Sequence, residues 1–338
     1  MGKMGTIVPI FSNMNTGLSH LRTFVGWILP LVLAVLPLAG QTKPPATAKS
    51  WTLPRTSDGH PDFQGVWTNA TVTPFERPSQ YSGQKTLTNA EIAEVEEQAA
   101  EGRVDRAPRA GDPGNYNQFW FDRGTKVVPT HQSSLVIDPA DGRVPALTPA
   151  AQKRQNELRA YAAAHPADDP EDRSLQERCI LWGTAGPPMV PGPYNNNYQI
   201  VQGPGYVAIL VEMIHDVRLI PTDGGPHLPK SIRLWMGDPR GHWEGNTLVV
   251  DTTNFTDKTR FRGADENLHL IERFTRVNAD TINYQFTVDD PTAFSRPWTG
   301  QIPMTHSDEP LFEYACNEGN YSLGDILRGA RAQEKETK

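Results

Sequence analysis

Residues 281–288 alternate strictly between apolar and polar side chains, and this pattern constrains the fold more than any other part of the chain. Because successive side chains of an extended strand point to opposite faces, a period of two predicts an antiparallel strand with one buried and one wetted face. The apolar members are Ile282, Tyr284, Phe286 and Val288, and the polar members are Asn283, Gln285 and Thr287.

Further strand-like segments follow Cys179, and short turns rich in Gly, Pro, Asn and Asp separate them. This spacing predicts a mainly β fold, in which an antiparallel meander forms either a barrel or a strongly curled sheet. The chain has no internal repeat of fixed period, which argues against a propeller. The segments read YQIVQ, YVAILVEM, VRLIP, NTLVVDTT, LHLIERFTRV, TINYQFTV and LFEYA.

About three peripheral helices are expected beside the sheet. A capping box that begins at Thr88 predicts a short helix ending near Gly102. A second helix is expected from a cap at Thr148, which a proline follows, to Ala164. The C-terminal helix is expected to take Ser322 as its cap.

Residues 1–40 have the composition of a secretory signal peptide. They contain no Asp or Glu, Arg22 precedes an apolar run from Phe24 to Ala39, and small residues at the end of the run offer a cleavage site. A membrane anchor is the alternative, but the run is shorter than the roughly 20 residues of a spanning helix and two prolines interrupt it. We therefore expect a periplasmic or secreted protein with no stable membrane insertion after cleavage.

The mature chain is expected to have three further parts. Residues 41–57 are rich in Pro, Thr, Ala and Lys and read as a flexible leader. Residues 58–178 are expected to form an N-terminal segment of strand and helix that packs on the core. Residues 179–338 are expected to form the antiparallel β core together with the C-terminal helix.

The charge of the chain limits its partners. The formal net charge is −7, and cleavage of the signal peptide removes Lys3 and Arg22 and no acidic residue, which leaves −9. A chain this acidic, with no basic run, repels phosphate backbones and anionic membrane surfaces. Nucleic acid and such membranes are therefore not expected as partners, and a polar small molecule or a glycan is.

Two cysteines, Cys179 and Cys316, lie in the mature part. Because an exported chain meets an oxidising compartment, we expect a disulfide between them. A loop of this length contributes about 5 kcal/mol in the chain-entropy model. Two buried free thiols are the alternative, and zinc has little support because neither cysteine has a partner at C-x-x-C spacing.

Residues from about 51 to 333 resemble a family of exported bacterial proteins of unassigned function. The resemblance carries no catalytic residues over to this chain. QGVW (64–67) also looks like the Gly-x-Trp at the first strand of lipocalin-type barrels. The stretches that carry the family resemblance are DFQGVW, SLVIDPADGR, GPYNNNYQIVQ, EMIHDVRLIP, WMGDPRGHWEGNTLVVDTTNF, ERFTRVNADTINYQFTVDDPT and YACNEGNY.

Glu212, His215 and Asp216 form the first candidate site. A carboxylate beside a histidine is the minimal unit of general base catalysis, since the acid orients the ring and raises its basicity. On a strand Glu212 and Asp216 would share a face, and a turn would be needed to return His215 to either acid. The structural alternative is that Asp216 pairs with Arg218 and His215 caps a hairpin.

Tyr194 and the run Asn195, Asn196 and Asn197 form the second candidate. Asparagine offers a donor and an acceptor, and tyrosine adds a flat apolar face, a combination that suits sugar hydroxyls or a polar ring. The alternative is a turn, because Gly-Pro precedes the run and asparagine tolerates left-handed backbone.

The segment RLWMGDPRGHWEGN (233–246) is the third candidate. Its aromatic and charged residues alternate as in pockets for polar ligands with apolar patches, and Arg240 and Trp243 are the expected ligand contacts. The alternative is that the tryptophans pack in a core and the end of the segment forms a hairpin turn.

We expect neither a metal nor a cofactor. Asp289-Asp290 has no EF-hand spacing, so an acid pair that caps a turn is favoured over calcium. The chain also lacks a nucleophile elbow, a phosphate-binding loop and a dinucleotide fingerprint.

Three classes of function remain open. The first is an exported cofactor-independent enzyme, a hydrolase, lyase or isomerase that works by general acid and base catalysis on a polar small molecule or glycan. The second is a β-barrel protein that binds a ligand without catalysis, and the third is a structural protein of the cell envelope. A titratable pair in a polar cleft would favour the enzyme, and an apolar cavity with Glu212 and His215 outside it would favour the binding protein.

Overall fold

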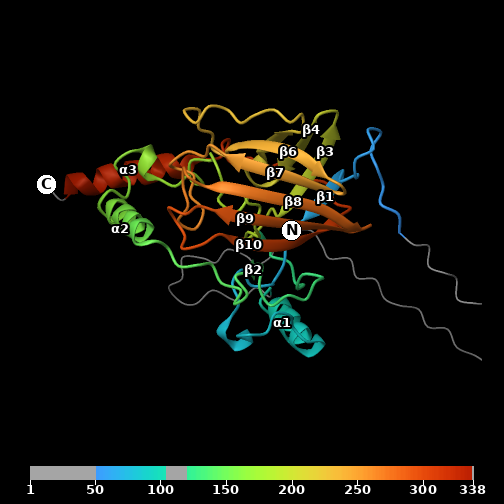
Figure 1. The fold of residues 1–338 in the computed structure, drawn as a ribbon. Helices are drawn as coiled ribbons and strands as arrows, with labels where there is room; N and C mark the ends of the chain where they lie inside the picture. The colour runs from blue at the N-terminus through green and yellow to red at the C-terminus, as the bar shows by residue number, and fades with distance from the viewer. Residues whose placement is uncertain (1–50, 104–119, 337–338) are drawn as a thin grey trace, which may run out of the picture. The chain divides into compact units, whose positions relative to one another are not determined.

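One antiparallel sheet of ten strands organises the chain in this computed structural model, which describes residues 51–103 and 120–336 (Figure 1). The strand order is β5-β4-β3-β1-β10-β9-β8-β7-β6, with β2 paired to β10. The expected signal peptide and the first ten residues of the expected leader lie outside the described residues. The strands are β1 (Gly65–Thr68), β2 (Val136–Asp138), β3 (Asn197–Gly203), β4 (Tyr206–Val211), β5 (Val217–Pro221), β6 (Asp238–Glu244), β7 (Thr247–Thr253), β8 (His269–Asn278), β9 (Thr281–Asp289) and β10 (Trp298–Ser307).

Two runs of hairpins make up this sheet, β3 to β5 and β6 to β10, and β1 joins them. β1 pairs with β3 on one side and with β10 on the other, so the N-terminal part of the chain supplies a central strand. Trp67 of β1 is fully buried and donates its indole N–H to the Phe63 carbonyl at 2.8 Å. The predicted mainly β, antiparallel fold with three helices is confirmed.

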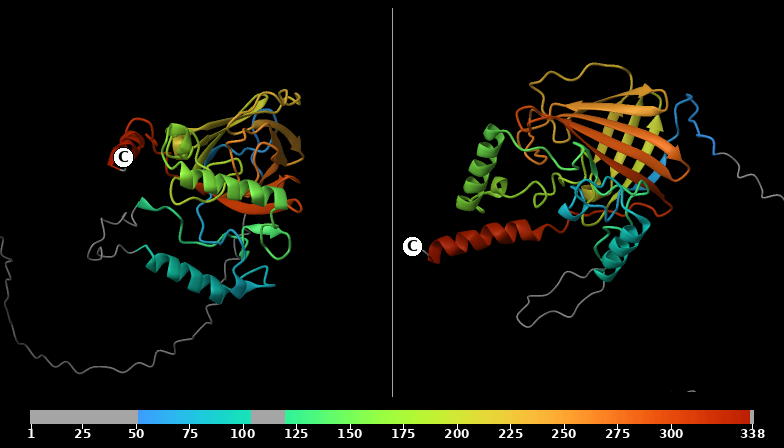
Figure 2. Two further views of the ribbon diagram at one scale, coloured as in Figure 1. Left: turned by 90° about the vertical axis from the view of Figure 1, so that its left-hand side faces the viewer. Right: turned by 60° about the horizontal axis from the view of Figure 1, so that its bottom comes forward.

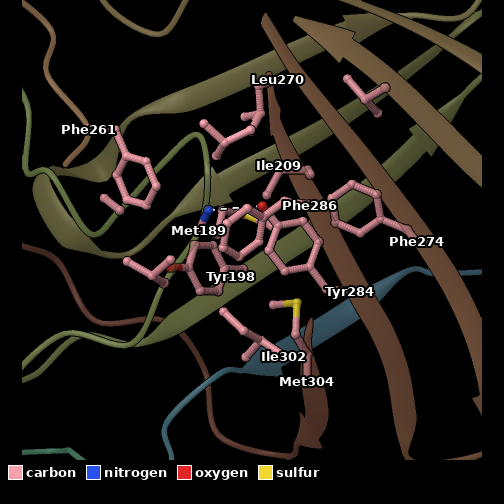
Figure 3. Close-up of a cluster of buried hydrophobic side chains, with 14 of the residues drawn as sticks. Met189, Tyr198, Ile209, Phe261, Leu270, Phe274, Tyr284, Phe286, Ile302 and Met304 are labelled. Carbon is pink, nitrogen blue, oxygen red and sulfur yellow. Dashed lines mark hydrogen bonds between the residues drawn. The ribbon is translucent and has the colours of Figure 1, made fainter. Parts of the chain in front are cut away.

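The alternation at 281–288 is also confirmed, and it builds the core. All four apolar members of that stretch are fully buried on β9. Their rings pack against those of neighbouring strands, with 4.9 Å between the ring centroids of Tyr284 and Phe274 and 5.7 Å between those of Phe286 and Trp298. Figure 3 shows this cluster in the hollow of the sheet, with Ile209 of β4 and Leu270 of β8 contributing to it.

A buried ion pair crosses the core. The inward positions of β5 and β8 include Arg218 and Glu272, and the two side chains are 1% and 0% exposed. Arg218 Nη1 donates to Glu272 Oε1 at 3.0 Å and Nη2 donates to Oε2, so the contact is bidentate. The Tyr284 hydroxyl also donates to Glu272 Oε1, at 2.8 Å, and accepts the Met189 N–H at 3.0 Å.

The sheet curves around this core but does not close into a barrel, so the barrel alternative is wrong (Figure 2). β5 and β6 end the strand order, and among the described residues no ladder joins them. Each of these edge strands contains a proline, Pro221 in β5 and Pro239 in β6. A proline has no backbone N–H, so both facing edges lack a donor that a closing ladder would need.

The three helices lie outside the sheet: α1 (Asn89–Glu101), α2 (Pro149–Ala164) and α3 (Tyr321–Glu336). The capping box at Thr88 and the cap at Thr148 are confirmed. The cap expected at Ser322 is wrong, because α3 begins before it and Leu323 N–H donates to the Asn320 side chain at 3.3 Å. None of the helices among the described residues has the length and hydrophobicity to cross a bilayer.

The disulfide between Cys179 and Cys316 is confirmed, and the two positions have a sequence separation of 137. It fixes the stretch that leads into α3 to the segment that precedes β3. Asn320 strengthens the same junction, since its side-chain amide donates to the Glu177 carbonyl at 2.8 Å.

Replacement of Glu272 by leucine is predicted to destabilise the protein strongly. The variant leaves the charge of Arg218 buried without a counterion, and the loss of one partner of a buried pair costs about 3–5 kcal/mol of unfolding free energy. Urea denaturation monitored by tryptophan fluorescence measures this change.

Two controls accompany that experiment. The double variant Arg218→Met/Glu272→Leu removes both charges and is expected to recover most of the stability. Arg273→Gln breaks only the ion pair with Glu244, in which the side chains are 41% and 49% exposed, and costs less than about 1 kcal/mol. A Glu272→Leu protein as stable as Arg273→Gln would show that the buried pair does not hold the sheet.

Candidate functional site

The gap between the edge strands β5 and β6 contains a pocket of about 480 Å³, which we call the open seam. Its walls are formed by residues of the two strands and of the connection between them, together with Ile180 and Asp216. They are Ile180, Asp216, Val217, Arg218, Leu219, Pro221, Leu228, Leu234, Trp235, Met236, Gly237, Asp238, Pro239 and Arg240.

The seam lies on one side of a close contact between β5 and β6 at Gly241. Strand directions alternate along the order of the sheet, so β5 and β6 run parallel to each other. Their later residues touch: a Cβ atom on Gly241 would lie 2.9 Å from the Cγ2 atoms of both Ile220 and Thr222, which only glycine avoids. The β6 residues that line the pocket, Asp238, Pro239 and Arg240, all precede Gly241.

The wall formed by β5 offers unpaired backbone groups. Val211 N–H donates to the Asp216 carbonyl at 2.8 Å. The backbone N–H and C=O groups of Asp216 and of every second residue after it therefore point toward β4. Val217 and Leu219 therefore turn their N–H and C=O groups toward the seam. A ligand in the seam can hydrogen-bond to this strand edge as well as to side chains.

Two acidic residues line the seam, Asp216 and Asp238, and Asp238 is paired with His227 and Arg240. The carboxyl of Asp216 is partly buried and makes no hydrogen bond or ion pair with any side chain in the part of the chain that the structure describes. Burial raises its pKa above the usual range, and the charge of His215 offsets this only in part. A carboxyl group with a raised pKa keeps its proton to a higher pH than an ordinary aspartate does, so it can donate a hydrogen bond over a wider pH range.

Two arginines border the seam. Arg218 reaches into the core, and its Nε is buried without a hydrogen-bond partner among the described residues. Burial is the largest single effect and lowers the pKa of Arg218, but the charge and hydrogen bonds of Glu272, with smaller contributions from Tyr284 and Tyr198, together raise it. Arg240 is held by the Pro226 carbonyl, 2.8 Å from its Nε, and by Asp238, 3.1 Å from its Nη2.

The connection from β5 to β6 is fastened to the sheet by His227. Its Nδ1 lies 3.1 Å from Asp238 and its Nε2 lies 3.0 Å from Asp251. Leu228 N–H adds a 2.8 Å hydrogen bond to Asp238. The connection thus forms a fixed second wall of the seam.

Large apolar side chains are exposed around the seam. Val217 and Leu219 on β5 are 54% and 57% exposed, and Leu234 and Trp235 on the opposite wall are 41% and 37% exposed. Four such side chains at one pocket make a contiguous apolar surface, which in a folded protein usually marks a place of contact.

The Glu-His-Asp cluster does not stay together in the fold. Glu212 is buried and accepts hydrogen bonds from the Asn197 amide at 2.7 Å and the Phe312 N–H at 3.0 Å. His215 Nδ1 donates to the Tyr314 carbonyl at 2.9 Å. Only Asp216 lines the seam, because the turn between β4 and β5 sends the three side chains in different directions. The alternative pairing of Asp216 with Arg218 is wrong, since Arg218 binds Glu272.

The asparagine run braces the backbone. Asn195 has a left-handed φ of 53°, and Asn196 is buried, with its Oδ1 accepting the Gly192 N–H at 2.7 Å. Asn197 holds Glu212. Tyr194 lines a separate cavity of about 510 Å³ beside the disulfide, where its ring lies 5.7 Å from that of Trp182.

The third candidate segment divides between two places. Arg240 lines the seam. Trp243 is not among the residues that line the seam and stacks on His60, with 4.6 Å between the ring centroids. Asp290 caps a turn as expected, since its Oδ1 accepts the Thr292 N–H at 3.0 Å.

Sequence reasoning missed Arg218 and Glu272. The signal was present in the alternation, since Glu272 falls between Leu270 and Phe274 on the inward face of β8. It also missed His227, which no local pattern connects with Asp238 or Asp251. The catalytic and binding roles expected for the candidate residues stay predictions.

Metal-ligating side chains do not gather in this structure. Within residues 51–103 and 120–336, no group of three or more His, Cys, Asp or Glu side chains is arranged to hold a metal ion.

Fold and seam together define a mainly β protein with a pocket of small-molecule size at the unclosed edge of its sheet. No family model, no curated protein and no solved structure matches the chain. What the seam binds is consequently inferred from its own chemistry.

Asp216→Asn is predicted to change how stability depends on pH. The folded-state pKa of Asp216 is raised, so its contribution is fully present at acidic pH and is lost as the pH rises through the folded pKa. Relative to Asp216→Asn, the wild type should lose stability between acidic and neutral pH. Urea denaturation of both proteins at a series of pH values measures this difference. A constant difference across the series would contradict a raised pKa.

Proposed function

We propose that this chain is an exported protein that binds a small molecule in the open seam. The observation that carries the proposal is the combination of a pocket of about 480 Å³ with exposed apolar side chains on both walls. Ligand sites of this size are mostly apolar and contain a few polar groups that orient the ligand. The seam matches that description with Asp216, Arg218 and Arg240 as its polar groups.

The ligand has an apolar body and a hydrogen-bonding end. Its body lies between Leu219 on one wall and Leu234 and Trp235 on the other. Its polar end reaches the carboxyl of Asp216 or the guanidinium of Arg240, and the free backbone edge of β5 offers further donors and acceptors. A wholly polar ligand such as a free sugar would leave the apolar walls without a partner.

Binding without catalysis is favoured over enzymatic activity by the surroundings of the expected catalytic pair. Glu212 and His215 lie outside the lining of the seam. Their partners are an amide, a backbone N–H and a backbone carbonyl, none of which titrates. Neither side chain is therefore hydrogen-bonded to a group that could exchange a proton with it.

Export and a strongly curled sheet belong to this proposal. The disulfide between Cys179 and Cys316 supports export, because such bonds persist in oxidising compartments. The approach of Gly241 to Ile220 supports the curl, because it brings the two ends of the strand order together.

The seam is expected to bind the neutral apolar fluorophore N-phenyl-1-naphthylamine with saturable enhancement of its fluorescence. Leu219→Glu should weaken this binding at least tenfold, because it places a charge on the apolar wall. Leu219 is more than half exposed, so the variant should fold normally.

Val201→Glu is the matched control. Val201 is also an exposed apolar residue on a strand, 43% exposed on β3, and it does not line the seam. It should bind the fluorophore like the wild type. Equal binding by the Leu219→Glu and Val201→Glu proteins would reject the seam as the binding site.

An exported acid-base enzyme is the second candidate, and the state of Asp216 favours it. A carboxyl with a raised pKa and no side-chain partner among the described residues is suited to general acid catalysis, with Arg240 beside it to hold a negative oxygen. The reaction would be a hydrolysis, elimination or isomerisation of the bound molecule.

Incubation of the mature protein with an extract of extracellular metabolites and glycans tests the enzyme. Mass spectrometry is expected to show a changed mass with the wild type and none with Asp216→Asn, while fluorophore binding stays within about twofold in both proteins. Identical mass changes with the wild type and Asp216→Asn would exclude Asp216 as the acid. Absence of any change, with intact fluorophore binding, would leave ligand binding as the function.

A further inference from the structure

A second pocket, of about 540 Å³, lies beside α2 and gathers four basic side chains. Leu158, Tyr161 and Ala162 of α2 form one side, and the rest comes from residues 171–176, from Arg178, from four residues between 181 and 187, and from residues 258–261. We call it the basic pocket after Arg173, Arg178, Lys258 and Arg260, all of which line it. None of these residues lines the open seam, so the two pockets are separate sites.

The acidic residues of the basic pocket are already engaged. Glu171 accepts a hydrogen bond from Lys258 at 2.7 Å, and this contact lowers the pKa of Glu171. Asp172 accepts the Tyr161 hydroxyl at 3.2 Å and the Asp169 N–H at 3.0 Å. The charge of Arg178 also lowers the pKa of Glu171, but Glu171 is hydrogen-bonded to Lys258, and the lining as a whole has four cations against two carboxylates.

Two of the four cations lack a partner. Arg173 is bound by the Pro166 carbonyl and by Glu177, and Lys258 is bound by Glu171. The guanidinium groups of Arg178 and Arg260, by contrast, make no hydrogen bond or ion pair within the described residues. Arg178 is partly buried, so it is less well hydrated than a free surface arginine.

The remaining walls of the basic pocket are apolar. Leu158, Leu175, Leu181, Pro187 and Phe261 contribute side chains to it. An organic molecule with a hydrophobic body can pack against these walls while an anionic end meets the guanidinium groups. Guanidinium binds carboxylate and phosphate in a bidentate manner, which favours these two anions over halides.

We infer that the basic pocket binds a small organic anion, a carboxylate or a phosphate ester, through Arg178 and Arg260. The net charge of −7 gives anions little affinity for the rest of the surface, so anion binding reports this pocket. The inference goes beyond the ligand of the open seam and is independent of it.

Isothermal titration calorimetry with phenyl phosphate and with benzoate tests the inference on the mature protein. At least one of the two should bind with one site per chain, and the tighter one identifies the anionic group. Arg178→Gln and Arg260→Gln should each weaken that binding about tenfold or more, and the double variant should abolish it. Benzyl alcohol, which has a similar ring and no charge, should bind far more weakly.

Arg159→Gln is the matched control. Arg159 is exposed on α2, the helix that forms one side of the basic pocket, and it does not line the pocket. The control variant should bind the anion like the wild type and have the same melting temperature as the two pocket variants. Failure of both anions to bind, equal binding by the double variant, or equal binding of benzyl alcohol would overturn the inference. Fluorophore binding in the open seam should be unchanged in all of these variants. The proposal for the basic pocket can therefore be rejected without rejecting the proposal for the seam, and the reverse also holds.

Discussion

The ion pair between Arg218 and Glu272 is the contact on which the arrangement of the sheet depends. It joins β5, at one end of the strand order, to β8, near the other end, through the interior. Two charges in an apolar core carry a desolvation cost, which the bidentate geometry and the Tyr284 hydroxyl offset. Burial and the charge of Glu272 raise the pKa of Tyr284 well above its usual value, so this hydroxyl stays neutral and donates to Glu272 at every physiological pH. The two runs of hairpins are thereby tied to each other through side chains as well as through β1.

The open seam follows from the same arrangement. The contact of Arg218 with Glu272 holds β5 against the core. β5 does not pair with β6 along its length, because Pro221 and Pro239 leave the facing edges without two backbone N–H donors. Glycine at position 241 lets the two strands approach each other closely, and the pocket is lined by the β6 residues that precede this contact. The pocket thus combines a free strand edge, apolar side chains from both walls and a buried guanidinium. Binding at this place needs no specialised motif in the sequence, because the unfinished edge of the sheet supplies both the space and the polar groups.

Local patterns in the sequence predicted the local features well. The alternation around Tyr284 identified a strand and its buried face, and the caps at Thr88 and Thr148 identified two helix starts, because each depends on neighbouring residues alone. The site was harder to predict. Glu212 and His215 are close in sequence to Asp216, but a turn with left-handed residues sends them toward the segment around Phe312 and Tyr314. The three asparagines were expected to bind a ligand. In the structure Asn196 instead accepts a hydrogen bond from the Gly192 N–H, so it stabilises the backbone beside it.

By itself, the sequence determined that this chain forms antiparallel strands with a wetted and a buried face, that helices begin at defined caps, and that its two cysteines can form one disulfide. These properties depend on periodicity, on caps and on composition, all of which are local. The tertiary structure alone decided that a strand from the N-terminal part joins the two runs of hairpins, that Arg218 meets Glu272, and that the sheet stays open between β5 and β6. Such pairings bring together residues far apart in the chain, and their free energy depends on burial and geometry that no short stretch of sequence encodes.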